Sequence, residues 1–191
     1  MSVTAREWWA VIHGMGLGAV FLLAFAGGFA GLYSLKPALI TPEGIVERIR
    51  RLKVGVIAMA VASWGTVITG TWIVYPWYRE KLAISGDDEL AGCSGATVPT
   101  EECSPRDFLL SNASGDTEQW HLFGMEWKEH IAWISPILAT VVAFIVLYYG
   151  TNLIRHERVR RTAMTLFVMS FAFAAIAGAL GAFITKVAPV K

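Results

Sequence analysis

The side chains in this sequence best suited to chemistry are two of its four histidines, His13 and His130. Imidazole is a good axial ligand for haem iron. His13 follows Trp8 and Trp9 by a little over one helical turn, and His130 follows Trp127 by about one turn. Tryptophans favour a membrane interface. We therefore expect both imidazoles near one membrane surface at similar depth, where they could ligate one haem b from opposite sides.

The helix face that carries His13 is small and rich in glycine. The residues at helical spacing from it are Gly16, Leu17, Val20, Ala24, Gly27, Gly28 and Gly31. Such a face would leave room for a flat macrocycle, so Gly16 is a candidate cofactor-binding residue. Small residues also allow membrane helices to approach closely. In that second interpretation, His13 is a hydrogen-bonded interior residue without a cofactor.

The face that carries His130 is bulky. Its members at helical spacing are Trp133, Ile134, Ile137, Val141, Phe144 and Tyr148. They could wall a porphyrin, but the face could equally point at lipid or at a neighbouring subunit. The small residues of the same segment lie on the opposite side, and they are Ala132, Ser135, Ala139 and Ala143.

Charged residues lie close to both histidines in the sequence. Arg6, Arg79 and Lys128 could pair with haem propionates, or they could extend their charged ends to lipid headgroups. Glu126 and His130 are one helical turn apart and could share a metal ion. Charged residues at the start of a helix are, however, ordinarily solvated anchors.

The other two histidines suggest no second haem. His121 is interpreted as a solvent-facing loop residue, although it could replace His130 as a ligand if its segment folds over the bundle. His156 lies between Arg155 and Arg158 at the far end of its helix. Because no other histidine matches its depth, we expect His156 to be an interfacial residue.

Four long apolar stretches must position these histidines. They cover about 8–35, 54–78, 130–154 and 162–188, and a bilayer core needs about 20 helical residues. The sequence therefore predicts an all-α integral membrane protein, a four-helix up-down bundle in one membrane domain over residues 1–191. The long connection near 79–127 joins the second and third helices.

Basic residues predict the orientation of this bundle. They collect in the first and third connections, as Lys36, Arg48, Arg50, Arg51 and Lys53, and as Arg155, Arg158, Arg160 and Arg161. Because cytoplasmic loops retain lysine and arginine, both termini and the acidic 79–127 loop are expected on the extracytoplasmic side. We expect the membrane to be a bacterial inner membrane.

The outer loop contains both cysteines of the chain, Cys93 and Cys103. An extracytoplasmic location is oxidising, which favours a disulfide between them over free thiols. A metal site would need further ligands, and the sequence has neither a second CxxC motif nor a CxxCH haem-attachment motif.

Composition and motifs exclude several classes of function. With 55% hydrophobic residues and a net charge of +1, the chain has no basic field for nucleic acid. It contains no nucleophile elbow, P-loop, Rossmann fingerprint or HExxH motif. The expected partners are the lipid bilayer and other membrane subunits, and an enzymatic activity of its own is left open.

With His13, His130 and the run Gly14-Met15-Gly16-Leu17-Gly18, the predicted bundle resembles membrane b-type cytochromes, which hold haem between histidines of four helices. The resemblance covers the four helices. It implies one haem b near the extracytoplasmic face of an electron-transfer protein or a redox subunit of an oxidoreductase complex. Electrons would be exchanged with a quinol or with a periplasmic redox protein that docks on the acidic loop.

A different class of function fits the same residues. The chain could be a non-catalytic accessory subunit of a larger respiratory or photosynthetic membrane complex, with its aromatic and glycine-rich faces packed on other helices. It would then hold no cofactor, or a chlorophyll-type pigment whose magnesium needs a single histidine ligand.

Overall fold

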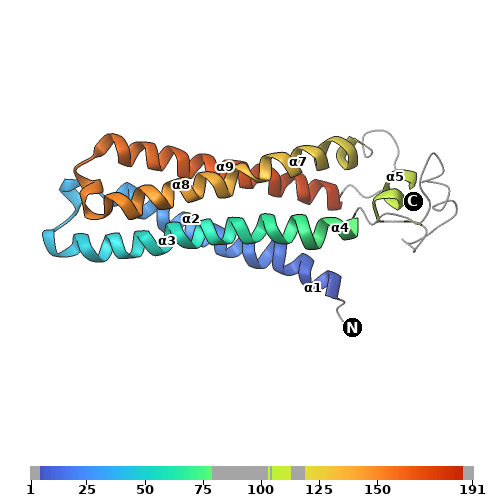
Figure 1. Ribbon diagram of the computed structural model, residues 1–191, viewed down its shortest axis with the longest axis horizontal. Coiled ribbons are helices and arrows are strands. Elements are labelled where there is room, and N and C mark those ends of the chain that lie inside the picture. The colour runs from blue at the N-terminus through green and yellow to red at the C-terminus, as the bar shows by residue number, and fades with distance from the viewer. Residues whose placement is uncertain (1–4, 79–102, 104, 113–118, 187–191) are drawn as a thin grey trace.

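The computed structural model describes residues 5–78, 103, 105–112 and 119–186, and these form helices and no strand. Four long helices lie side by side (Figure 1). Helix 1 comprises α1 (Ala5–Val11), η1 (Ile12–Gly16) and α2 (Leu17–Ser34). Helix 2 comprises α3 (Pro42–Thr69), η3 (Gly70–Val74) and α4 (Tyr75–Tyr78).

Helices 3 and 4 complete the bundle. Helix 3 comprises η5 (Trp120–Gly124), α7 (Met125–Ala132), α8 (Ile134–Tyr149) and η6 (Gly150–Ile154). Helix 4 is α9 (Glu157–Lys186). Two short helices lie in the connections, η2 (Pro37–Leu39) and α5 (Pro105–Asn112). We name the two ends of the bundle by their residues: the loop end, where α4 ends and η5 begins, and the arginine end, where Arg155 and Arg160 lie.

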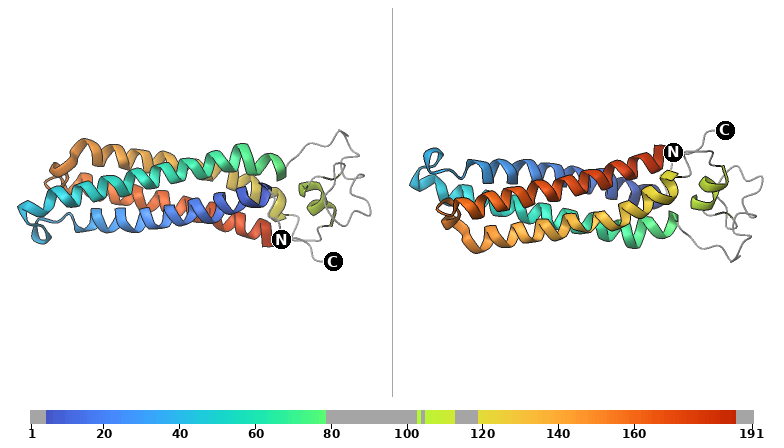
Figure 2. Two further views of the ribbon diagram at one scale, coloured as in Figure 1. Left: turned by 90° about the horizontal axis from the view of Figure 1, so that it is seen from below. Right: turned by 90° about the horizontal axis from the view of Figure 1, so that it is seen from above.

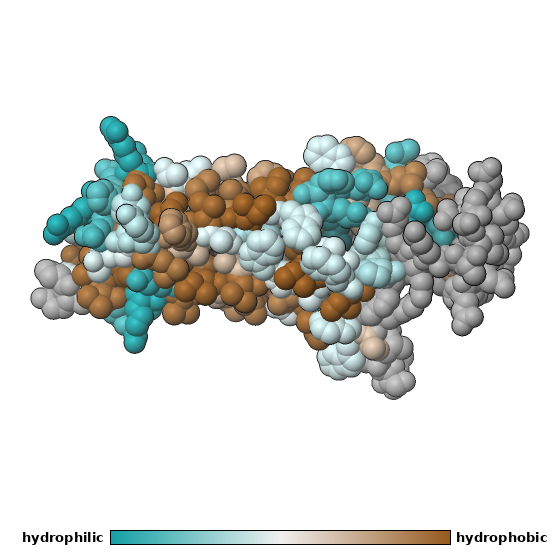
Figure 3. Space-filling view, in the orientation of Figure 1, coloured by the Kyte–Doolittle hydropathy of each residue, from teal (hydrophilic) through white to brown (hydrophobic). Residues whose placement is uncertain are grey.

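All four helices are long and apolar enough to cross a membrane. The spans are Trp8–Ser34, Gly44–Val74, Trp120–Ile154 and Glu157–Ile184. Figure 3 shows a hydrophobic surface over the middle of the bundle, bounded by hydrophilic residues at the arginine end and by mixed residues toward the loop end. The predicted all-α fold with four apolar helices is therefore confirmed.

Three helices begin five or more residues earlier than predicted. Helix 2 begins at Pro42 rather than near 54, helix 3 near Trp120 rather than 130, and helix 4 at Glu157 rather than 162. An apolar run marks only the part of a helix that lies in lipid, and charged residues can continue the helix beyond it. In helix 2, the Thr41 hydroxyl accepts a hydrogen bond from the Gly44 amide (3.2 Å) and caps this charged extension.

The helices pack in chain order. Helix 1 packs on helix 2, helix 2 on helix 3, and helix 3 on helix 4, which closes the ring against helix 1 (Figure 2). Helices 1 and 2 approach closely, since a Cβ on Gly55 would lie 3.3 Å from the Gly28 backbone nitrogen. A Cβ on Gly28 would also meet the Phe167 ring. At Gly28, the predicted use of glycine for helix packing is confirmed.

Arginines cap helix 1 at the arginine end. Arg160 is buried and donates to the Leu35 carbonyl, and Arg48 donates to the Ser34 carbonyl at 3.4 Å. The last carbonyls of a helix have no partner within it. Arg160 therefore supplies a partner that water cannot supply, because Leu35 is fully buried.

Replacing Arg160 with alanine should lower the free energy of unfolding by about 2 kcal/mol, because a buried carbonyl loses its charged donor. Arg161→Ala is the matched control, since Arg161 forms an exposed ion pair with Glu157 (2.6 Å) that should contribute under about 1 kcal/mol. Denaturant unfolding in detergent, followed by circular dichroism, measures both. Equal losses for the two variants would contradict the capping role.

Candidate functional site

Wide helical turns gather at the loop end. The segments η1, η3 and η5 are π-helical, and each lies toward the loop end of its own helix. Single π-helical turns within α-helices are frequent at functional sites. η1 contains His13, and η3 begins with Gly70, which lies beside His13. The irregular backbone thus coincides with the predicted site.

His13 points into the bundle and contacts helix 2. Its Nδ1 lies 2.9 Å from the Thr69 hydroxyl, and that hydroxyl donates to the Gly65 carbonyl at 2.7 Å. Because the hydroxyl proton is used there, Nδ1–H of His13 is the donor to Thr69 and the neutral ring keeps its lone pair on Nε2. Metal-ligating histidines are usually oriented by this kind of second hydrogen bond.

Gly70 allows the His13 ring to lie against the backbone of helix 2. A Cβ on Gly70 would lie 2.8 Å from Cε1 of His13 and 3.5 Å from its Nε2. Any larger residue would push the ring away from its present place. Thr69 and Gly70 together therefore fix the position and the tautomer of His13.

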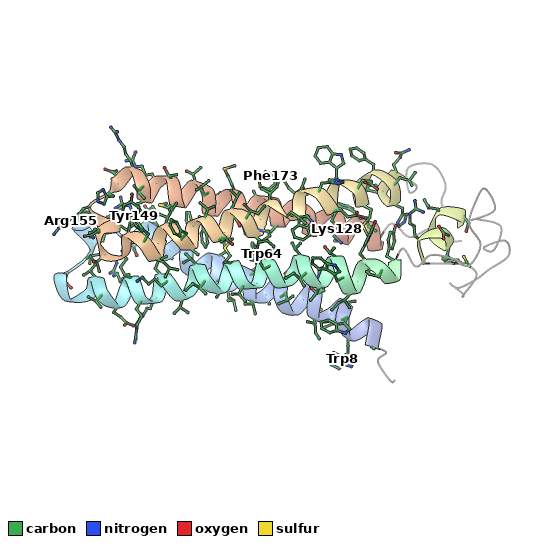
Figure 4. All side chains as sticks on the ribbon, in the orientation of Figure 1. Trp8, Trp64, Lys128, Tyr149, Arg155 and Phe173 are labelled. Atoms are coloured by element: carbon green, nitrogen blue, oxygen red, sulfur yellow. The ribbon has the colours of Figure 1, made fainter. Side chains whose placement is uncertain are left out.

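Lys128 enters the bundle from α7, toward helix 4. A Cβ on Gly181 would lie 3.2 Å from Cε and 3.5 Å from Nζ of Lys128. Figure 4 labels this side chain close to the loop end. Among the described residues, no carboxylate lies within 4.0 Å of the Lys128 ammonium. Its neighbour Glu129 supplies an opposite charge nearby. Oε1 of Glu129 is buried and forms no hydrogen bond within the described residues.

His130 lies on the other side of α7. It is exposed, and its Nδ1 donates to the Glu126 carbonyl at 2.7 Å. Two residues along a helix are a rotation of about 200°, so His130 faces away from Lys128 and from the interior. His13 and His130 therefore face different spaces. One haem between the two imidazoles does not fit this arrangement, although the Nε2 atom of each keeps a lone pair.

The remaining predicted site residues add little evidence for a cofactor site. Gly16 lies in η1 beside open space, with only the Val11 carbonyl within 4 Å of an added Cβ (3.9 Å). Arg6 lies in α1, and its side chain is not among those described; Arg79 lies outside the described residues. The described part of the chain brings together no group of three or more metal-ligating side chains.

The predicted disulfide concerns the connection between helices 2 and 3. Cys103 is fully buried beside α5. Cys93 lies outside the described residues. Their pairing therefore stays a prediction.

His121 is buried, so its interpretation as a solvent-facing residue is wrong. Its Nδ1 lies 3.1 Å from the Tyr78 hydroxyl, and the two rings stack at 6.4 Å. The prediction placed His121 in the connection before helix 3, whereas η5 continues helix 3 across this residue. His121 borders an open cavity of about 390 Å³, lined by Tyr75, Arg106, His121, Leu122, Phe123, Met125, Glu126 and Trp127.

Three residues of the site were missed or misplaced by sequence reasoning. Thr69 and Gly70 carry no signal in the sequence alone, and Lys128 was expected at the surface. A signal for Lys128 existed, because it lies one turn before Ala132 on the small-residue side of helix 3.

A scan against protein-family models, a search of curated proteins and a search of solved structures found no match to this chain.

Proposed function

We propose that this chain is a membrane electron-transfer protein or subunit that binds one haem b at the loop end, with His13 as an axial ligand. The observation that carries the proposal is the His13 imidazole, which Thr69 orients and whose Nε2 forms no hydrogen bond with the described residues. Haem iron accepts such a nitrogen. When bound, haem supplies one-electron oxidation and reduction.

The residues around His13 would prepare it for this role. Thr69 orients the ring and keeps the proton on Nδ1, so that no proton must leave before Nε2 binds iron. Gly70 has no side chain that would collide with the ring. The second predicted ligand, His130, faces outward, so His13 is the histidine that we propose as an axial ligand.

The electrons would be exchanged at the loop end. The arginine-rich connections at the opposite end support a cytoplasmic location for that end, which would place the loop end and both termini outside a bacterial inner membrane. A quinol in the bilayer or a periplasmic redox protein is the expected partner. The cavity beside Glu126 and Trp127 lies at this same end of the bundle.

The absorption spectrum of the purified protein tests the proposal. We expect a reduced-minus-oxidised spectrum with a b-type α-band, and a pyridine haemochrome assay that gives about one haem per chain. Haem should be added during expression, so that poor supply does not limit loading. A haem-free protein under these conditions would contradict the proposal.

A second function is favoured by the outward position of His130. Its face continues along helix 3 with exposed Phe144 and Tyr148, and one exposed imidazole suits a pigment shared with another membrane subunit. In this alternative the chain is an accessory subunit of a larger complex. The same spectrum separates the two, because a chlorophyll-type pigment absorbs in the red and gives no pyridine haemochrome.

A further inference from the structure

Three elements form the cavity of about 390 Å³ at the loop end. One wall comes from η5 and the first turn of α7, while α4 supplies Tyr75 and α5 supplies Arg106. α5 packs on α4 and on η5 beyond the ends of helices 2 and 3 (Figure 1). Small-molecule sites commonly measure about 300–1,000 Å³, so this volume suits a single ring. We call this space the loop-end cavity.

Aromatic side chains line the loop-end cavity. The rings of Phe123 and Trp127 on helix 3 lie with their centroids 5.5 Å apart at an interplanar angle of 45°, and both side chains are exposed. Tyr75 of helix 2 adds a third ring. Aromatic rings favour contact with the face or edge of another ring. This lining therefore favours a ligand with an aromatic group.

Two charged side chains also line the loop-end cavity. Glu126 forms no ion pair with the described residues, so its carboxylate is available to accept a hydrogen bond. Arg106 lies 3.4 Å from the carboxylate of buried Asp107. An anionic phosphate is disfavoured, because Arg106 already has an anion beside it and Glu126 would repel another. A neutral ligand with hydroxyl groups fits better, since a hydroxyl both donates and accepts.

The loop-end cavity lies at the end of a lipid-facing stripe on helix 3. His130 follows Trp127 by three residues, and the exposed Ile137, Val141 and Phe144 continue the stripe at helical spacing. These residues belong to the apolar span of helix 3. A ligand whose head occupies the cavity would thus have an apolar surface in the bilayer for its tail.

We infer that the loop-end cavity binds the headgroup of a quinol, with the apolar tail of the quinol along helix 3. One hydroxyl donates to the Glu126 carboxylate, the oxygen of the other accepts from the Arg106 guanidinium, and the ring lies on Phe123 and Trp127. The choice of a quinol rests on the proposed electron-transfer function, and the inference adds the site where the quinol binds. Binding at this site is measured independently of haem.

Photolabelling of the full chain tests the location. The protein is reconstituted in phosphatidylcholine vesicles with a short-tailed ubiquinol that carries a diazirine at the base of its tail, and the label is located by mass spectrometry. We expect the label on η5, α7 or α5, and we expect excess unlabelled quinol to remove it. Labelling confined to other segments would overturn the inference, and so would equal competition by phosphatidylglycerol, which would identify a lipid site.

Two variants test the polar contact and the space. Glu126→Leu removes the acceptor and should weaken quinol binding about tenfold, as expected for a lost hydrogen bond to a charged group. Leu122→Trp should reduce labelling to background, because Leu122 lines the cavity and an indole would fill it. Glu157→Leu and Leu23→Trp are the matched controls, since both residues are exposed and neither lines the cavity.

Both controls should bind the quinol like the wild type, and circular dichroism with thermal unfolding checks that all four variants fold alike. If Glu126→Leu binds as well as Glu157→Leu, Glu126 does not hold the headgroup and the inference is wrong. The same conclusion follows if Leu122→Trp is labelled as strongly as Leu23→Trp.

The outcomes also separate this inference from the proposed function. If the protein binds haem but the quinol does not label the loop-end cavity, the inference is wrong and the function stands with a periplasmic redox protein as partner. If the quinol labels the cavity of a protein that binds no haem, the proposed function falls and the quinol site stands. If neither ligand binds, both are wrong.

Discussion

Replacing His13 with alanine is expected to remove haem from the protein completely. The Thr69 hydroxyl of helix 2 orients the His13 ring, and its Nε2 is the atom that would bind iron. Alanine leaves no nitrogen at that position. Pyridine haemochrome and reduced-minus-oxidised spectra of the purified variant measure the loss, and thermal unfolding of the haem-free protein shows whether the fold is kept.

His130→Ala is the matched control for this experiment. His130 is exposed and faces away from the interior, so its removal should leave haem content and the α-band unchanged. Loss of haem in both variants would instead mean that the helices rearrange to form the bis-histidine pair that the sequence predicts. Loss in His130→Ala alone would contradict the role of His13 and favour a cofactor on the outer surface of helix 3.

The four helices could be predicted because hydropathy alone detects them. Their ends could not, since a membrane helix continues past the lipid wherever its charged residues are capped or solvated. The helical segment before residue 54 illustrates this, because Thr41 caps it and Pro42 occupies its first turn. The apolar run contains none of this information.

The orientation of helix 3 about its own axis, that is, which face points into the bundle, could be predicted in part. Its bulky face was expected to line a porphyrin or to point at lipid or a neighbour, and Phe144 and Tyr148 are exposed. Its small residues Ser135 and Ala139 are buried instead. Extending that buried side one turn beyond Ala132 leads to Lys128 and away from His130, so the same periodicity argues against a shared space for the two histidines.

The contact between His13 and helix 2 could not be predicted. It depends on which residue of helix 2 lies at the depth of His13, and hydropathy does not give the relative shift of two helices. The π-helical turns change the rotation further, because η1 contains His13 and η3 begins at Gly70. Thr69 therefore becomes a candidate only when the two helices are placed together.

Thr69→Val should weaken haem binding by about 10- to 100-fold, the usual cost of losing the group that orients a metal-ligating histidine. Valine keeps the shape of threonine but gives the Nδ1–H of His13 no acceptor, so the ring is free to turn or to move its proton to Nε2. A proton on Nε2 blocks the lone pair that would bind iron. Titration of haem into the haem-free protein, followed at the Soret band, measures the affinity.

Two further variants decide whether the hydroxyl itself is responsible. Thr69→Ser keeps an acceptor at the same place and should restore most of the affinity. Thr66→Val removes a hydroxyl one turn away that donates to the Ala62 carbonyl of its own helix (2.8 Å), and this variant should bind haem like the wild type. If Thr69→Val and Thr66→Val behave alike, the Thr69 hydroxyl does not position His13, and the ring must be held by its contacts with Gly70 and the Thr66 backbone.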